Sequence, residues 1–215
     1  MLITFEGIDG SGKSTQVRLL ADALRAEGRT VHVVREPGGT PLSEAVRALL
    51  LAPTSEIAPN AELLLFSSAR AQLVADVIRP ALGRGETVLA DRFYDSTTAY
   101  QGGGRGLADP EWLGRFHAFV TGGLAPARTF LVDVPVALAA QRRGGDAARD
   151  GADRMEAGGD PFFERVREAY LALARREPGR IHVLDGSQPV EALHAQILAD
   201  TRGLLSAPAP GTATG

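Results

Sequence analysis

The sequence predicts an α/β fold in which a parallel sheet is flanked by helices. Short β-favouring runs alternate with helical patterns along the chain, which is typical of β-α-β units. The first run leads into a complete phosphate-binding loop, whose pattern requires a strand before it and a helix after it. The second run ends in a turn-rich loop, where open α/β sheets bind ligands. The phosphate-binding loop is Gly7-Ile8-Asp9-Gly10-Ser11-Gly12-Lys13-Ser14, followed by Thr15.

Five apolar runs are expected to be the strands of this sheet. Each is short and rich in β-favouring residues, as buried strands of parallel sheets are. The runs lie at residues 2–5, 30–34, 87–90, 129–132 and 181–184.

Helical patterns separate these strands. Apolar residues recur at helical spacing directly after the phosphate-binding loop. Asp109 and Pro110 predict another helix start, as N-cap and first-turn residue. Pro80 is expected to close the longest helix of the first half. Helices are also expected over residues 42–51, 61–78, 162–176 and 190–205.

Three segments are predicted to be irregular. Residues 101–106 are glycine-rich and are expected to form a flexible loop. Residues 144–153 lack periodicity and are expected to form a mobile surface loop, within a lid over about 142–154. The last ten residues, 206–215, are expected to be disordered, which leaves one domain over 1–205.

Composition excludes several classes of protein. The chain of 215 residues is long enough for one domain with a real core. Its net charge of −3 argues against general affinity for nucleic acid. It contains no cysteine, which excludes disulfides, thiol catalysis and zinc–thiolate sites. The first strand begins at Leu2 and no apolar run is long enough to cross a bilayer, so we expect neither signal peptide nor membrane span and a cytoplasmic location.

The phosphate-binding loop is the strongest functional feature. Its glycines let backbone N–H groups approach a polyphosphate, and the next helix adds a partial positive charge. Lys13 is expected to reach the β- and γ-phosphates of ATP, and Ser14 to bind Mg²⁺. Lys13 is the only lysine among 23 basic residues, which fits a site that needs a compact charge. The alternative is a chance glycine turn before a helix.

Further candidates lie after the second and third strands and on the long helix. Asp91 ends the third strand, where such enzymes place a carboxylate linked to Mg²⁺; a turn-forming Asp is the alternative. Phe66 and Arg70 share a helix face and together suit a planar base, although a core Phe and a surface Arg would have the same spacing. Arg35 stands beside a turn. It could bind the phosphate of an acceptor, and the alternative is a surface arginine with no such role.

Arginines gather around the predicted mobile loop. Arg142 and Arg143 precede it, Arg149 lies in it and Arg154 follows. A solvated charged face and a lid that closes over ATP both account for them.

Two other classes of phosphate-loop protein are excluded. A GTPase reads guanine with a second lysine motif, which a chain with Lys13 alone cannot contain. The acidic D-E-x-x motif of helicases is absent as well.

Four motifs in order resemble those of bacterial thymidylate kinases. They are Phe5–Gln16, Arg35–Thr40, Leu65–Arg70 and Asp91–Gly102, and the resemblance extends from residue 1 to about the last helix. It implies the fold of a P-loop nucleoside monophosphate kinase, with a five-stranded parallel sheet and a mobile lid. It also implies transfer of the γ-phosphate of ATP to dTMP, giving dTDP, with Mg²⁺. A homodimer is implied too, and the helix over 61–78 is apolar on more than one face.

The resemblance assigns residues to the base and the sugar. Phe66 would stack on thymine, and Arg70 would bond its O4. Thr97 would lie near N3, and the pocket beside Pro37 would take the methyl group. Tyr100 would lie under the sugar, where a ribose 2′-hydroxyl would clash.

The resemblance also assigns residues to the phosphate of dTMP. Arg35 and Arg92 would hold it, while Asp9 would approach the 3′-hydroxyl and the metal. Gln101 belongs to the same motif and is expected in the substrate site. Phe93 stands where relatives often have Tyr or His, a mild departure.

The charge needed in the transition state is not complete in the phosphate-binding loop. Some relatives carry a basic residue at the position of Gly10. We therefore expect a lid arginine, Arg143 or Arg149, to join Lys13, Asp91 and Arg92 in catalysis. Two alternatives stay open, a deoxynucleoside kinase and a regulatory module that binds ATP without transferring phosphate.

Overall fold

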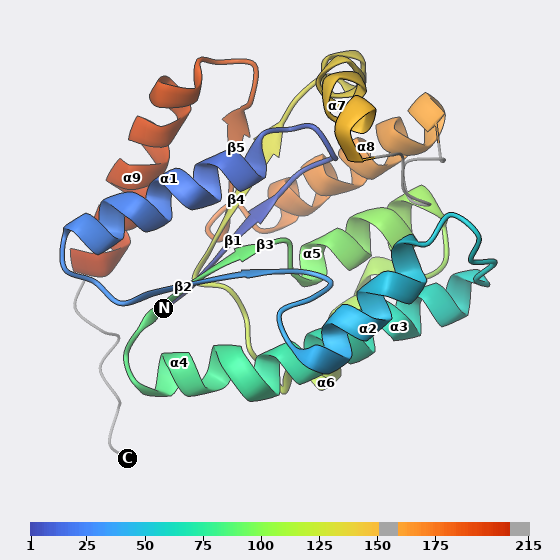
Figure 1. Cartoon of the computed structure of the whole chain (residues 1–215), viewed down its shortest axis with the longest axis horizontal. Helices are drawn as coiled ribbons and strands as arrows, with labels where there is room; N and C mark the ends of the chain where they lie inside the picture. Colours follow the sequence, from blue (N-terminus) through green and yellow to red (C-terminus); the bar gives the residue numbers. More distant parts are fainter. Residues whose placement is uncertain (151–158, 207–215) are drawn as a thin grey trace.

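A five-stranded sheet forms the centre of the molecule. The computed structural model describes residues 1–150 and 159–206, with the backbone alone over 145–150 (Figure 1). All strand pairs are parallel and the order is β2-β3-β1-β4-β5. The predicted parallel sheet is confirmed, with each strand within one residue of its expected bounds. The strands are β1 (Leu2–Glu6), β2 (Val31–Arg35), β3 (Thr87–Asp91), β4 (Arg128–Asp133) and β5 (Ile181–Asp185).

Helices cover both faces of the sheet, as Figure 1 shows. Side chains of β1 alternate between them, because successive residues of a strand face opposite ways. Ile3 and Phe5 pack in the cluster of α1 and α9, whereas Leu2 packs with the segment around Ile78. The helices are α1 (Lys13–Ala26), α2 (Pro41–Leu51), α3 (Pro59–Leu73), α4 (Arg79–Gly83), α5 (Tyr94–Thr97), α6 (Pro110–Thr121), α7 (Val136–Asp150), α8 (Gly159–Arg176) and α9 (Val190–Ser206), with π-helical turns η1 (Val74–Ile78) and η2 (Thr98–Gly104).

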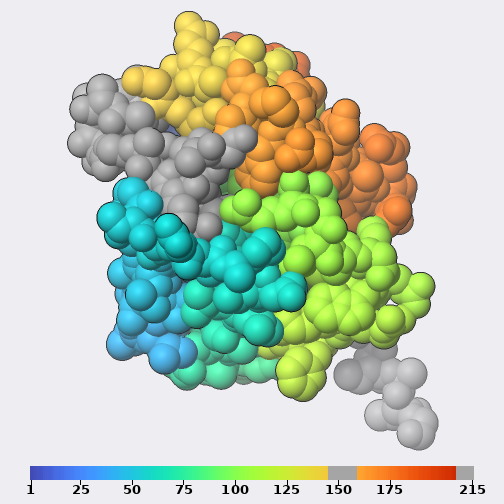
Figure 2. Space-filling view, turned by 90° about the vertical axis from the view of Figure 1, so that its right-hand side faces the viewer, coloured from blue at the N-terminus to red at the C-terminus, as the bar shows by residue number. Residues whose placement is uncertain are grey.

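The start of α6 follows the prediction. The Asp109 side chain accepts a hydrogen bond from the N–H of Trp112 at 2.9 Å, and Pro110 occupies the first turn. An N-cap oxygen of this kind satisfies one of the free N–H groups of a helix start. In Figure 2, α6 lies beside α3 on one face of the molecule.

The predicted end of the long helix is wrong. The helix predicted over 61–78 begins at Pro59 and continues through η1 into α4 as far as Gly83. Pro80 lies in the first turn of α4 and does not end the helix. The π-helical turn just before it widens the backbone, so the proline ring avoids the carbonyl group that a regular helix would place against it.

The loop predicted over 101–106 is also wrong as far as Gly104. Residues 98–104 form η2, which packs against α8. A Cβ on Gly104 would lie 2.6 Å from the ring of Phe162 and 2.8 Å from Val166. These glycines therefore permit a close helix contact, whereas the sequence pattern suggested flexibility.

The loop predicted over 144–153 is wrong as far as Asp150, because α7 continues to that residue. The segment contains Ala and Arg, which are strong helix formers that outweigh its two glycines. Residues 151–154 of the predicted lid and residues 207–215 of the predicted tail lie outside the described residues.

Candidate active site

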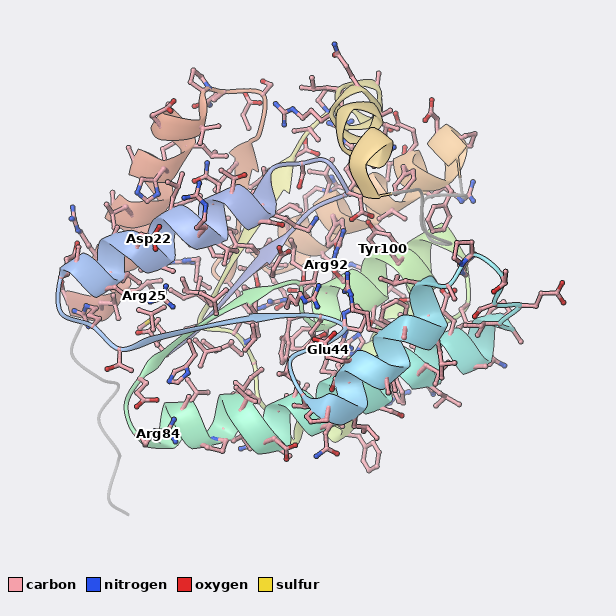
Figure 3. The ribbon with its side chains drawn as sticks, in the orientation of Figure 1. Asp22, Arg25, Glu44, Arg84, Arg92 and Tyr100 are labelled. Carbon is pink, nitrogen blue, oxygen red and sulfur yellow. The ribbon has the colours of Figure 1, made fainter. Side chains whose placement is uncertain are left out.

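The candidate site lies at the carboxyl ends of β1, β3 and β4, where the phosphate-binding loop meets the segments that follow β2 and β3. This is the ligand-binding edge of an open parallel sheet. Figure 3 shows Arg92 and Tyr100 close together there. The Arg92 guanidinium lies 4.9 Å from the centre of the Tyr100 ring.

The phosphate-binding loop needs its glycines. Gly7 and Gly10 have φ of 141° and 82°, values that side chains disfavour. A Cβ on Gly7 would lie 2.5 Å from the carbonyl oxygen of Val132, and one on Gly10 equally close to that of Ala139. The backbone therefore passes tightly between β4 and α7, and α1 begins directly after it at Lys13.

Lys13 is buried within the site. Its Nζ lies 3.7 Å from Oδ1 of Asp9 and donates to the carbonyl oxygen of Ile8 at 3.5 Å. Burial, followed by the charge of Arg92, lowers the pKa of the Lys13 ammonium, while nearby carboxylates oppose this shift. A polyphosphate at the loop would add negative charge beside this cation.

Ser14 and Asp91 meet at the start of α1. The Ser14 hydroxyl donates a hydrogen bond to Oδ2 of Asp91. Hydroxyl and carboxylate oxygens suit Mg²⁺, which takes one or two protein ligands together with phosphate oxygens and water. Among the side chains that the structure describes, no group of three or more His, Cys, Asp or Glu could hold a metal ion. Because Ser14 and Asp91 are in contact and carry oxygen ligands, the pair predicted to bind Mg²⁺ is chemically suitable.

A first cavity contacts the phosphate-binding loop through Asp9 and has a wall from α2, α3, α5 and η2. Its lining includes every residue predicted to bind the acceptor except Arg35. The lining residues are Asp9, Glu36, Pro37, Arg47, Leu51, Phe66, Arg70, Arg92, Ser96, Thr97, Tyr100 and Gln101.

Arg35 points elsewhere in this conformation. Its side chain is 55% exposed, and its guanidinium donates to Glu44 at 3.1 Å. The phosphate role predicted for Arg35 therefore stays a prediction.

Arg70 and Glu36, two residues that line the first cavity, form a buried ion pair. Arg70 Nε donates to Glu36 Oε2 at 2.6 Å, and the two side chains are 1% and 4% exposed. Arg70 Nη1 and Glu36 Oε1 are buried and have no hydrogen-bond partner among the described residues. Burial raises the pKa of Glu36 to about 7, against the opposing charge of Arg70. A buried donor and acceptor in one pocket suit the polar edge of a planar base.

Arg92 connects this cavity to the phosphate-binding loop. It is the one non-glycine residue with positive φ (73°) in the described part of the chain. Its Nη2 donates to Asp9 Oδ1 at 2.6 Å and to Tyr100 Oη at 3.0 Å. Burial opposes ionisation of Asp9, but the charges of Arg92 and Lys13 outweigh it and hold the pKa of Asp9 well below its usual range.

A second cavity lies on the other side of the phosphate-binding loop. It brings together most of the residues predicted to bind the nucleotide, while Ile8 is buried beneath them and Asp9 lines the first cavity. The lining residues are Gly10, Ser11, Gly12, Lys13, Ser14, Thr15, Gln16, Arg142, Gly186, Gln188, Val190 and Leu193.

Two arginines of α7 hold the phosphate-binding loop. Arg142 donates to the carbonyl oxygens of Ser11 at 3.3 Å and Gly186 at 3.1 Å. Arg143 donates to the carbonyl oxygen of Asp9 at 2.7 Å. The side chain of Arg149 and all of Arg154 lie outside the described residues.

Sequence reasoning missed several residues of the first cavity. Glu36 and Ser96 stand inside motifs that were recognised, beside residues that were assigned, so their position was a usable signal. Arg47 donates to the carbonyl oxygen of Pro37 at 2.9 Å, but nothing distinguishes it from a surface arginine in the sequence. Tyr170 is not part of this lining, but it contacts the lining residue Arg92 from α8, which no local pattern indicates.

Comparison with known proteins gives one consistent result. The family model for thymidylate kinase matches residues 5–197. The thymidylate kinase of Pseudomonas putida is 53% identical over 206 residues, covering 95% of this chain and 98% of the relative. That of Deinococcus radiodurans is 52% identical over 200 residues, covering 93% and 95%. The crystal structure of thymidylate kinase from Ehrlichia chaffeensis aligns with a TM-score of 0.75 and 35% identity, covering 94% of this chain and 98% of that one.

Proposed function

We propose that this chain, which belongs to the thymidylate kinase family, transfers the γ-phosphate of ATP to dTMP and yields dTDP and ADP. The observation that carries this proposal is the position of Arg92. It borders the acceptor cavity and contacts Asp9 of the phosphate-binding loop. A cation there can hold an acceptor phosphate within reach of the γ-phosphate of ATP.

The proposed base pocket uses Arg70 and Phe66. Arg70 Nη1 is a buried donor without a partner among the described residues, and a base carbonyl such as O4 of thymine would satisfy it. The Phe66 ring borders the same cavity and offers a surface for stacking. Thr97 and Tyr100 complete the walls near N3 and the sugar.

The proposed chemistry needs no general base. The acceptor is already an anionic phosphate at neutral pH, so catalysis consists of alignment and charge neutralisation. Lys13 and Arg92 supply fixed positive charge, and both contact Oδ1 of Asp9. Ser14 and Asp91 would hold Mg²⁺, which would supply further neutralising charge to the phosphates of ATP when bound.

We propose that a lid arginine supplies the remaining charge, within one kinase domain over residues 1–205. Arg143 is the candidate whose side chain the structure describes, and it already borders the phosphate-binding loop. Its contact with Asp9 supports this role, because it holds the guanidinium beside the loop that would bind the phosphates of ATP. Arg149 stays an equal candidate, with its side chain outside the described residues.

We also propose a homodimer and a cytoplasmic location. Helices α3 and α6, which lie side by side on one face in Figure 2, carry large exposed apolar side chains. Phe119 is 85%, Leu64 57% and Trp112 41% exposed. A second copy of the chain would cover this face by a two-fold interface. We expect light scattering at micromolar concentration to give twice the monomer mass, and a monomer alone would contradict the dimer. None of the helices in the described residues is long and apolar enough to cross a membrane.

A product assay tests the proposed function. The chain is incubated with ATP, Mg²⁺ and dTMP, and nucleotides are separated by anion-exchange chromatography. We expect equimolar dTDP and ADP, with no dTDP when Mg²⁺ is omitted. ATP binding without dTDP formation would instead support a regulatory module.

A further inference from the structure

Glu6 is a buried carboxylate to which the mechanism above gives no task. It ends β1, directly before the phosphate-binding loop, and is fully buried. Its Oε1 accepts a hydrogen bond from the N–H of Phe93 at 2.7 Å. Its Oε2 accepts from the Ser96 hydroxyl at 2.6 Å and from the Tyr170 hydroxyl at 2.8 Å. Three donors from two separate segments therefore converge on one carboxylate.

The same two hydroxyl groups bind Arg92. Nη1 of Arg92 donates to Ser96 Oγ at 3.0 Å and to Tyr170 Oη at 3.2 Å. A hydroxyl has one proton, so a hydroxyl that donates to Glu6 turns its lone pairs toward the guanidinium. Glu6 thereby orients this pair of hydroxyl acceptors, which also lie 2.8 Å from each other, within hydrogen-bond distance.

Glu6 also holds the backbone at Arg92. This residue has φ of 73°, a left-handed conformation that residues with a side chain disfavour. The Glu6 bond to the N–H of Phe93, the next residue, secures the chain on the far side of that turn. Backbone and side chain of Arg92 are thus constrained by one carboxylate.

We propose that Glu6 is a positioning residue that sets the orientation of the Arg92 guanidinium toward the acceptor phosphate, acting through Ser96 and Tyr170. The inference rests on the proposed role of Arg92. Burial, followed by the charge of Asp95, raises the pKa of Glu6 to about 7. A side chain that only filled space would not need a carboxylate where ionisation is disfavoured.

The test compares two ligands that differ by the phosphate alone. Binding of dTMP and of thymidine is measured by calorimetry for wild type and Glu6→Gln, together with turnover of dTMP. The amide has the size of the carboxylate, but its NH₂ group donates, so it competes with Arg92 for the hydroxyl oxygens. We expect the Kd for dTMP to rise about tenfold or more and turnover to fall up to about a hundredfold, while the Kd for thymidine changes less than about twofold.

Two further variants make the outcome specific. Arg92→Ala is the reference, and it should also abolish the preference for dTMP over thymidine. Asp133→Asn is the matched control, because it removes a carboxylate that anchors α8 through Arg167 at 2.7 Å and that forms no hydrogen bond or ion pair with Glu6 or Arg92 in the described part of the chain. We expect this control to keep the preference.

Each result supports or overturns one claim. If Arg92→Ala keeps the preference, the proposed role of Arg92 fails. Suppose that Arg92→Ala loses the preference for dTMP over thymidine. If Glu6→Gln then keeps this preference, or weakens the binding of dTMP and thymidine equally, the Glu6 inference alone is overturned. If Glu6→Gln does not fold, the double variant Ser96→Ala/Tyr170→Phe removes the two hydroxyls instead. That variant should lose the preference, and retention of it would overturn the inference.

Discussion

The guanidinium of Arg143 donates a hydrogen bond to the backbone carbonyl oxygen of Asp9, 2.7 Å away, and lies 4.3 Å over the ring of Phe163. A helix that follows β4 thereby holds the loop that follows β1. The contact brings a cation to the phosphate-binding loop at the point where Gly10 provides none. Arg143 is therefore both a support of the loop and a candidate for the charge that completes the transition state.

Loss of the lid arginines should reduce turnover with little change in dTMP affinity. We expect Arg143→Ala or Arg149→Ala to lower turnover about 10³-fold or more, the low end for an arginine that stabilises the transition state. Turnover and dTMP binding are measured for single alanine variants at 142, 143 and 149 and for the triple variant. A triple variant that keeps more than about a tenth of wild-type turnover has lost less than about 1.4 kcal/mol of transition-state stabilisation. That result would mean that the lid does not supply the missing positive charge.

Substitution of Gly10 should impair the phosphate-binding loop more than backbone strain alone explains. A Cβ at Gly10 would lie 2.5 Å from the carbonyl oxygen of Ala139, and its φ is 82°. Gly28 has nearly the same φ, 81°, but open space around it. Gly28→Ala should therefore cost the strain alone, about 1–2 kcal/mol of unfolding free energy.

We expect Gly10→Ala to cost more than this control and also to raise the KM for ATP. Urea unfolding and steady-state kinetics of the two variants measure both effects. Equal losses of stability with an unchanged KM for ATP would show that α7 does not press on the loop.

Removal of Arg70 should weaken the binding of dTMP, the phosphate acceptor, and leave the binding of ATP, the phosphate donor, nearly unchanged. We expect Arg70→Ala to weaken dTMP binding by about 1.5–3 kcal/mol, because a charge-assisted hydrogen bond to the base is lost. Glu36 would then be buried without its partner, so Arg70→Ala is also combined with Glu36→Gln to remove that charge. Calorimetry with dTMP and with an ATP analogue gives the two affinities. Equal weakening of both ligands in the double variant would assign Arg70 a purely structural role.

His117 should make the fold sensitive to mild acid. Burial, followed by the charge of Arg70, lowers the pKa of His117 to about 3, and its Nδ1 has no hydrogen-bond partner among the described residues. The unfolded chain binds this proton near pH 6.5, so stability is present above that pH and is lost as the pH falls toward 3.

Between pH 6.5 and 5 this single group should reduce the unfolding free energy by about 1–2 kcal/mol. Urea unfolding of wild type and His117→Gln at both pH values isolates the effect. Parallel losses in the two proteins would show that His117 is not the cause.

Local patterns were sufficient for the sheet and for the phosphate-binding loop. Each strand is a continuous apolar run, and the loop from Gly7 to Ser14 is contiguous in the sequence, so spacing alone identifies them. The pair Phe66 and Arg70 is predictable because four residues make about one helical turn. Residues 101–104 were mistaken for a loop because glycine marks both flexibility and close packing, and only a packing partner such as Phe162 distinguishes the two. Residues 144–150 were mistaken for a loop because their glycines were given more weight than the helix-forming Ala and Arg beside them.

Contacts between distant segments were beyond sequence reasoning. Glu6, Arg92 and Tyr170 meet although 86 and 78 residues separate successive members, and none of them stands in a periodic pattern with another. Arg35 shows the opposite case. Its sequence context suggested the acceptor phosphate, but the nearby carboxylate of Glu44 pairs with it in this conformation.

The central claim is that the acceptor is a nucleoside monophosphate held by its phosphate. Turnover with dTMP and with thymidine, offered side by side with ATP and Mg²⁺ in a coupled assay of ADP release, tests it most directly. Because Arg92 borders the cavity and holds Asp9, we expect dTMP to react and thymidine to react far more slowly. Faster turnover of thymidine would contradict the account and identify a deoxynucleoside kinase.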